Sequence, residues 1–252
     1  MSFYELGKEQ RNILVEKLSR DLSDGFRSAQ HGSIIQYFAD DDTYVRKAAY
    51  IATGRLYIAN KKMQPALIEV LNSLREDTEP KVRQTTVNAA GEIGKNDFDI
   101  VKHFFDKGLF DEHHSVRNAV IGSMKKMGEK NPEPVITWSR GYLHHADKEI
   151  RREICHGIEL RGRTHPEDIL PLLKELQDDK TKRVRSTLVH VLGQISYKKG
   201  CLEKVLKEIW SWNNKELVAD AIEEIIDVHE RYRNFSFYTQ EEARRLVATY
   251  TK

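Results

Sequence analysis

The feature that most constrains this chain is a short pattern that returns at nearly constant intervals. A β-branched or aliphatic residue followed by arginine recurs along most of the sequence, and successive copies start 37, 34, 34 and 34 residues apart. A sixth copy, Leu217-Val218, follows 33 residues later and lacks the arginine. This regularity predicts a protein built from stacked copies of one supersecondary unit. The five complete copies are Val45-Arg46, Val82-Arg83, Val116-Arg117, Ile150-Arg151 and Val184-Arg185.

Each copy opens a segment with apolar residues at helical spacing. In the fifth copy, steps of three and four place apolar side chains on one face of a helix, whereas no long stretch alternates with period two. Those residues are Val184, Leu188, Val191, Leu192 and Ile195. Another amphipathic segment precedes each copy, so the repeating unit is predicted to be helix A, a turn and helix B. The expected A helices lie at 65–75, 98–105, 134–143, 166–176 and 202–210.

These units predict an all-α fold, an α-α superhelix in the form of a right-handed solenoid with about six helix pairs. We expect one domain over 1–252, with the pairs in 31–230 and an N-terminal cap in 1–30. A last helix in 231–252 is expected to cap the other end. Thr239 and Glu242 have the spacing of a capping box at its start.

An aspartate precedes the arginine by six residues in four copies, at Asp40, Asp77, Asp111 and Asp179. Such an aspartate can cap backbone N–H groups in the A–B turn and accept from the arginine of its own repeat. Stacking would then produce a ladder of alternating aspartate and arginine.

Two copies depart from this pattern. In the fourth copy His145 occupies the aspartate position while Arg151 is kept, so Arg151 either pairs with Asp147 or is free for another partner. In the sixth copy Trp212 and Val218 replace both members, as expected if the two residues act as a pair.

Three segments carry a resemblance to a known family. DTEPKVR at 77–83, DEHHSVR at 111–117 and DDKTKRVR at 178–185 resemble the Asp–Val–Arg signature of HEAT repeats. The resemblance implies that the B helices line a concave groove, and that the protein is a non-catalytic scaffold binding a protein or peptide there.

The polar residues expected on the groove side of the B helices are the candidate binding residues, although a solvated helix face is the alternative for any one of them. They are densest in 150–163, and the C-terminal end turns acidic at Glu223 and Asp227. The candidates are Lys47, Arg55, Gln84, Asn88, Arg117, Lys126, Arg151, Arg152, His156, Glu159, Arg163 and His190.

A narrower resemblance keeps nucleic acid open as a partner. Val-Arg-Asn-Ala-Val at 116–120 and NPEPV at 131–135 are similar to segments of the HEAT-like alkylpurine DNA glycosylases of bacterial DNA alkylation repair. This implies a DNA-binding protein or glycosylase as the alternative function, but no catalytic residue of that family finds a match. The formal net charge of +2 argues against a strongly basic, non-specific nucleic-acid binder.

No motif predicts an enzyme, a metal or a cofactor. The adjacent pairs His113-His114 and His144-His145 are poorly spaced for one metal, and His-Glu occurs only once, at 229–230. Cys155 and Cys201 lack metal-ligand spacing and are expected to be reduced thiols, as is usual in the cytoplasm. The N-terminal residues contain no apolar run, so the expectation is a cytoplasmic protein without a membrane span. The oligomeric state is left open.

Overall fold

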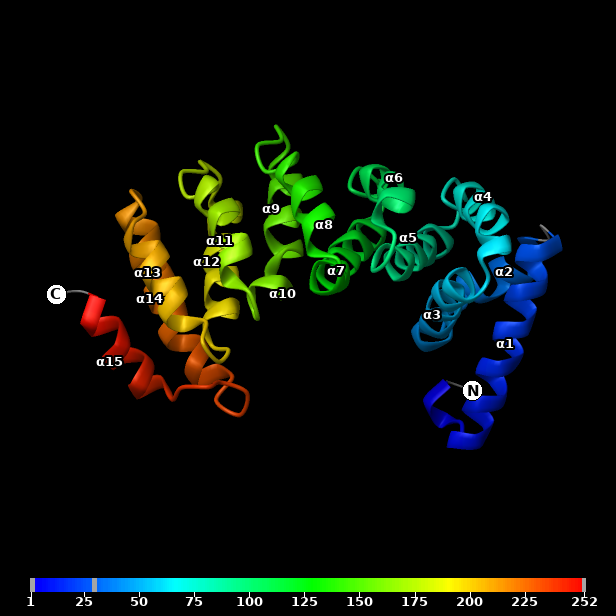
Figure 1. Cartoon of the computed structure of the whole chain (residues 1–252), viewed down its shortest axis with the longest axis horizontal. Helices are drawn as coiled ribbons and strands as arrows, with labels where there is room; N and C mark the ends of the chain where they lie inside the picture. Colours follow the sequence, from blue (N-terminus) through cyan, green and yellow to red (C-terminus); the bar gives the residue numbers. More distant parts are fainter. Residues whose placement is uncertain (1–2, 29–30, 251–252) are drawn as a thin grey trace. The chain divides into compact units, whose positions relative to one another are not determined.

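The computed structural model describes residues 3–28 and 31–250, and within these ranges every regular element is a helix (Figure 1). The chain divides into two compact units, Met1–Asn131 and Pro132–Lys252, here called unit 1 and unit 2. Each contains three pairs of helices joined by short turns. The all-α repeat fold predicted from the 34-residue period is confirmed.

In unit 1 a long helix precedes the three pairs. The pairs are α2 with α3, α4 with α5, and α6 with α7, and the second member of each is the B helix that starts near the Val-Arg pattern. The expected A helices at 65–75 and 98–105 correspond to α4 and α6. The elements are η1 (Phe3–Glu5), α1 (Lys8–Ser28), α2 (His31–Phe38), α3 (Thr43–Ala59), η2 (Lys61–Met63), α4 (Gln64–Leu74), α5 (Pro80–Gly94), α6 (Phe98–Gly108) and α7 (His114–Lys130).

In unit 2 the B helices are α9, α12 and α14, and the first of them is interrupted at Ile158, beyond which α10 follows. The predicted capping box precedes α15: the Thr239 N–H donates to Glu242 Oε2 at 2.8 Å, and the Glu242 N–H donates to Thr239 Oγ1 at 3.2 Å. The helices are α8 (Pro132–Arg140), α9 (Lys148–Gly157), α10 (Glu159–Gly162), α11 (Pro166–Glu175), α12 (Lys182–Ser196), α13 (Leu202–Trp210), α14 (Lys215–Arg231) and α15 (Gln240–Tyr250).

The core of each unit lies under the apolar faces of successive B helices. The predicted apolar residues of α12, from Val184 to Ile195, are fully buried. Neighbouring B helices pack closely, and a Cβ added to Gly91 of α5 would lie 2.3 Å from Ser123 Oγ of α7. That distance excludes a side chain at position 91, so the glycine sets the approach of the two helices.

The repeated arginines bind the backbone of their own A–B turns. Arg83 Nη1 donates to the carbonyl oxygens of Asp77 and Thr78 at 2.9 and 3.1 Å. These carbonyls offset the unfavourable position of a cation in the first turn of a helix. The expectation that the guanidinium is received by the carboxylate of its own repeat is therefore wrong for Arg83. The same bond to the carbonyl six residues earlier is made by Arg46, Arg117, Arg151 and Arg185.

Two of the turn carboxylates, Asp111 and Asp179, instead bind the arginine of the preceding repeat. Arg83 Nε lies 2.8 Å from Asp111 Oδ2 in unit 1, and Arg151 Nε lies 2.6 Å from Asp179 Oδ2 in unit 2. Both pairs have less than a fifth of either side chain exposed. The predicted ladder is thus seen as two pairs, one within each unit, and each pair joins neighbouring repeats instead of closing a single repeat.

The turn residue has a second role as a cap. The Asp179 carboxylate accepts the N–H of Thr181 at 2.8 Å, two residues later. In the fourth repeat His145 Nδ1 accepts the N–H of Asp147 at 3.1 Å, so an imidazole replaces the aspartate cap.

The sixth turn buries apolar side chains where the other repeats have aspartate and arginine, and hydrogen bonds from Asn213 and Asn214 to Gln177 join it to the preceding repeat. Trp212 is fully buried and Val218 is 6% exposed. The turn carbonyls are reached by a different cation, since Lys215 Nζ donates to Trp212 O at 2.8 Å and to Trp210 O at 3.2 Å.

Both cysteines are free thiols in buried positions, and burial raises the pKa of Cys155 far above its usual range. Across the described ranges, no helix is both long enough and apolar enough to cross a membrane.

Candidate functional site

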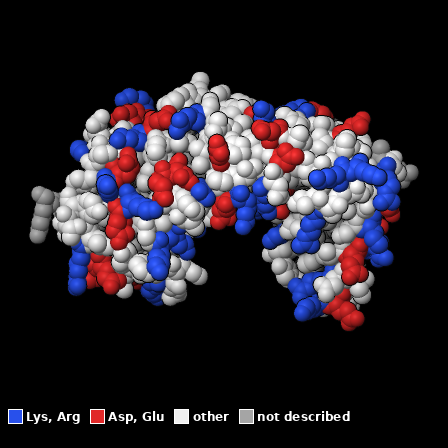
Figure 2. All heavy atoms as spheres, in the orientation of Figure 1, with Lys and Arg blue, Asp and Glu red and all other residues white. Residues whose placement is uncertain are grey.

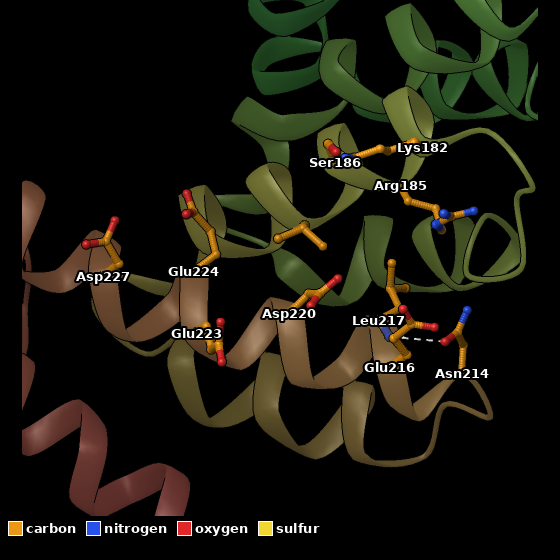
Figure 3. Close-up of a pocket in the computed structure, with 11 residues that line it drawn as sticks. Lys182, Arg185, Ser186, Asn214, Glu216, Leu217, Asp220, Glu223, Glu224 and Asp227 are labelled. Atoms are coloured by element: carbon orange, nitrogen blue, oxygen red, sulfur yellow. Dashed lines mark hydrogen bonds between the residues drawn. The ribbon is translucent and has the colours of Figure 1, made fainter.

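A groove of about 690 Å³ lies between the B helices α12 and α14 of unit 2 (Figure 3). Its α14 wall carries Glu216 in the first turn of the helix and, beyond it, a row of four carboxylates at Asp220, Glu223, Glu224 and Asp227. Steps of three and four place these four carboxylates on one face of the helix. The α12 wall is different in character, with Lys182, Arg185 and Ser186 near one end.

The four carboxylates are not equally neutralised. Arg231 lies 3.1 Å from Glu224 and also pairs with Asp227 from the same helix. Asp220 and Glu223 are exposed, and within the described part of the chain no cation lies within ion-pair distance of either. Asp220 and Glu223 therefore present negative charge that no ion pair neutralises, with the cations Lys182 and Arg185 on the opposite wall.

Beside this groove, α9, α10 and α12 hold a polar cluster that includes four of the predicted binding residues and Gln194. Glu159 is only 2% exposed, and its two carboxylate oxygens face different partners. Oε1 accepts from Arg163 at 2.5 Å, while Oε2 lies 3.1 Å from His156 Nε2. The His190 ring lies 5.9 Å from the His156 ring, between centroids. The structure thus brings His156, Glu159, Arg163 and His190 together.

Arg152, another predicted binding residue, lies in a separate charge network on α9. Its Nε is 2.9 Å from Glu149 Oε2, and its Nη2 is 3.4 Å from Glu153 Oε1. Arg183 of α12 reaches the same Glu149 at 3.0 Å. The guanidinium of Arg152 therefore pairs with two acidic residues of its own helix, Glu149 and Glu153.

Unit 1 has a groove of the opposite charge. Lys47 and Arg55 of α3 line it together with Lys95 and Lys126, in a volume of about 440 Å³. Glu92 reduces the positive charge, because it pairs with Lys95 and lies 3.5 Å from Lys126.

Two further predicted residues of unit 1, Gln84 and Asn88, are half-buried on α5. The Asn88 side-chain amide donates to the Gln84 carbonyl oxygen at 3.0 Å, one helical turn back. They do not line the unit 1 groove.

Two predicted binding residues lie in the first turn of a B helix and reach back to the A–B turn before it. Arg117 donates to the carbonyl oxygens of Asp111 and Glu112 at 2.6 and 3.0 Å. Arg151 binds His145 O and the Asp179 carboxylate, so neither alternative raised for it, pairing with Asp147 or freedom for an outside partner, describes its contacts. The sequence could not separate these arginines from groove residues because both types belong to B helices.

The prediction of binding residues omitted the acidic wall of α14. Glu223 and Asp227 are predicted only as an acidic end of the groove, and Asp220 and Glu224 are not part of the prediction. The signal was available in the sequence, since 220, 223, 224 and 227 have the spacing of one helical face.

Comparison with known proteins shows similarity to solved structures. No protein-family model and no curated protein matches the chain. Among solved structures, the Escherichia coli protein YibA is 18% identical over 98% of both chains, with a TM-score of 0.44. An archaeal HEAT-like repeats protein from Thermococcus onnurineus NA1 is 14% identical, with a TM-score of 0.43, and covers 95% of this chain and 96% of its own.

A designed armadillo repeat protein in complex with the peptide (KR)4 is 17% identical, with a TM-score of 0.38, over 78% of this chain and 99% of its own. None of these three structures is a DNA glycosylase, so the narrower resemblance to that family remains a prediction. The fold itself follows from the paired helices and the arginine-to-turn contacts of the chain. In its fold, the chain is an all-α protein of repeated helix pairs, and the solved structures it is similar to include HEAT-like and armadillo repeat proteins.

Proposed function

We propose that this chain is a binding scaffold and that the groove between α12 and α14 holds a basic segment of a protein partner. The observation that carries the proposal is the row of four carboxylates on the α14 wall, two of which no ion pair neutralises among the described residues. Lysine and arginine side chains of an incoming peptide would supply the missing positive charge.

The shape of the site supports a peptide over a small molecule. The groove is lined by two helices and is bordered by exposed side chains such as Lys182 and Glu223, so it is open along its length. Repeat proteins use extended surfaces of this kind to bind segments of other chains. Complementary charge across such a surface raises the association rate and selects among partners.

The test uses a fluorescently labelled peptide of eight alternating lysine and arginine residues, with a glutamine peptide of equal length as its neutral partner. We expect anisotropy titrations to show binding of the basic peptide alone, weakening as salt is raised. The double variant Asp220→Lys/Glu223→Lys is expected to lower the affinity at least about tenfold, which corresponds to about 1.4 kcal/mol.

The matched control is Glu167→Lys/Glu241→Lys, which changes the net charge equally at exposed positions on α11 and α15, outside the groove. It is expected to bind like the parent protein. Equal loss in both double variants would show that only the overall charge matters, and the groove would then not be the site.

Nucleic-acid binding is a second candidate, favoured by the basic groove of unit 1. Lys47 and Arg55 are exposed there, and Lys126 Nζ lies 4.9 Å from the centre of the Tyr50 ring. Across the face visible in Figure 2, however, basic and acidic side chains are interspersed and form no continuous positive field. Titration of the protein with a duplex oligonucleotide at low salt tests this second candidate. Binding by the parent that is lost in Lys47→Glu/Arg55→Glu would support nucleic-acid binding. No binding by the parent would exclude it.

A further inference from the structure

The repeat period places two histidines at equivalent positions of consecutive B helices. His156 is in the last turn of α9 and His190 is in α12, and they are separated by 34 residues, the period of the repeat. Their rings lie edge to face, with an interplanar angle of 73°. Glu159 comes three residues after His156, which brings its carboxylate to the same side.

These three side chains have the geometry of a metal-binding set. One ligand atom from each of them lies within 4.8 Å of the ligand atoms of the other two. Bonds from zinc to imidazole nitrogen or carboxylate oxygen are about 2.0–2.2 Å long, so the donors must move closer together by about an ångström. The histidine side chains are 33% and 42% exposed, which leaves them room to rotate toward the buried carboxylate.

The residues around the set hold it in a binding orientation. Arg163 Nη2 donates to Glu159 Oε1 at 2.5 Å and to Gln194 Oε1 at 2.7 Å, so Oε2 is the oxygen that faces His156. On the other side, Glu224 Oε1 lies 3.8 Å from His190 Nδ1. Outer contacts of this kind orient the ligands of metal sites and fix the histidine tautomer.

A second observation concerns Gln194, which Arg163 links to Glu159. Gln194 is 3% exposed, and its side-chain Nε2 has no hydrogen-bond partner in the described structure. An unsatisfied amide donor in a buried position is costly unless a water or another bound group accepts from it. A water or anion completing the coordination of a metal would be such an acceptor.

We propose that His156, Glu159 and His190 bind a divalent transition-metal ion, with zinc as the preferred ion. Two imidazole nitrogens and one carboxylate oxygen are a donor set that suits zinc and its neighbours better than calcium or magnesium. Three protein ligands leave one tetrahedral position for water or for a group of a bound partner. The site lies next to the acidic groove but does not depend on the peptide binding proposed above.

The test uses the full chain without a polyhistidine tag, freed of metal by a chelator that is then removed. Zinc is titrated by calorimetry and cobalt by its visible absorption, which reports the coordination geometry. We expect one ion per chain and a higher melting temperature with zinc than without it. His190→Ala and His156→Ala are each expected to weaken zinc binding at least about tenfold, because each removes one ligand.

The matched controls are His144→Ala and His165→Ala, two exposed histidines of the same unit that lie outside the cluster. They are expected to bind zinc like the parent. Glu159→Gln serves as a further variant, with circular dichroism to confirm folding because Glu159 is buried beside Arg163. The proposal is overturned if the parent takes up no zinc, or if the control variants lose as much affinity as His156→Ala and His190→Ala.

Discussion

Two A–B turns of unit 2 close the same kind of junction with opposite chemistry. In the turn between α11 and α12, Asp179 binds Arg151 of the preceding repeat and caps its own turn. In the turn between α13 and α14, Trp212 is fully buried instead, and Lys215 takes over the turn carbonyls. A junction of this kind therefore requires that the buried space is filled and that the turn carbonyl oxygens accept hydrogen bonds. A turn with an ion pair is one of two ways to meet these requirements.

The apolar turn should respond most strongly to loss of volume. Trp212→Ala removes the largest fully buried side chain of the described residues and is expected to lower the free energy of unfolding by about 3–5 kcal/mol. Denaturant unfolding followed by far-UV circular dichroism measures this. Trp210→Ala, two residues earlier and half-buried, should cost much less. A similar small loss in both variants would show that the turn is not held by Trp212.

The ionic turn should be sensitive to removal of one partner. Arg151→Met leaves the Asp179 carboxylate, whose side chain is 6% exposed, without its guanidinium and is expected to cost about 2–3 kcal/mol. The matched variant is Arg185→Met, which removes a guanidinium that donates to the Asp179 carbonyl oxygen. We expect it to cost about 1 kcal/mol. Equal losses would mean that the contact between repeats adds nothing to the contact within the turn.

Only the ionic turn should respond to acid. Burial alone would raise the pKa of Asp179, but hydrogen bonds from Arg151 and the Thr181 N–H outweigh it and lower that pKa below the ordinary 3.8. A carboxyl with a lowered folded pKa stabilises the fold above its unfolded pKa, and this contribution is lost as the pH falls toward the folded value. The difference in unfolding free energy between the parent and Asp179→Asn should therefore shrink from about pH 5 to about pH 2. Trp212→Ala should keep a constant difference over the same range.

The smallest effect is expected at the cation of the apolar turn. Lys215 is exposed, and its two bonds to turn carbonyls compete with water. Lys215→Met should lower the free energy of unfolding by only about 0.5–1 kcal/mol in the same denaturant experiment. A loss as large as that of Arg151→Met would show that the carbonyl contacts, and not the packing of Trp212, stabilise this turn.

The repeat fold could be predicted because its signals are local. The spacing of Val184 to Ile195 predicts a buried helix face, and Thr239 with Glu242 predicts a cap, since both depend on residues a few positions apart. The direction of the ladder could not be predicted in this way. Whether Arg151 reaches a carboxylate 28 residues later depends on how one repeat is placed on the next.

Only part of the candidate binding face could be predicted from the sequence, because the rest depends on how one helix is placed beside another. His156, Glu159, Arg163 and His190 were chosen from helical spacing, and the structure brings them into one cluster. The acidic wall of α14 was passed over, because a row of exposed carboxylates on a helix is equally typical of a solvated face. Its meaning depends on the groove formed with α12, which no single helix reveals.

The ladder contact also bears on how such a chain can lengthen. The third and fifth repeats carry both kinds of residue, an aspartate that receives the preceding arginine (Asp111 from Arg83, Asp179 from Arg151) and an arginine of their own, whereas the fourth repeat has His145 in place of the aspartate. A duplicated segment of one repeat length would therefore contain an aspartate for the arginine of the repeat before it and an arginine for the aspartate of the repeat after it. Gene duplication could add repeats in this part of the chain without inventing a new interface, whereas beyond Trp212 and Val218 the pattern has no arginine to pass on.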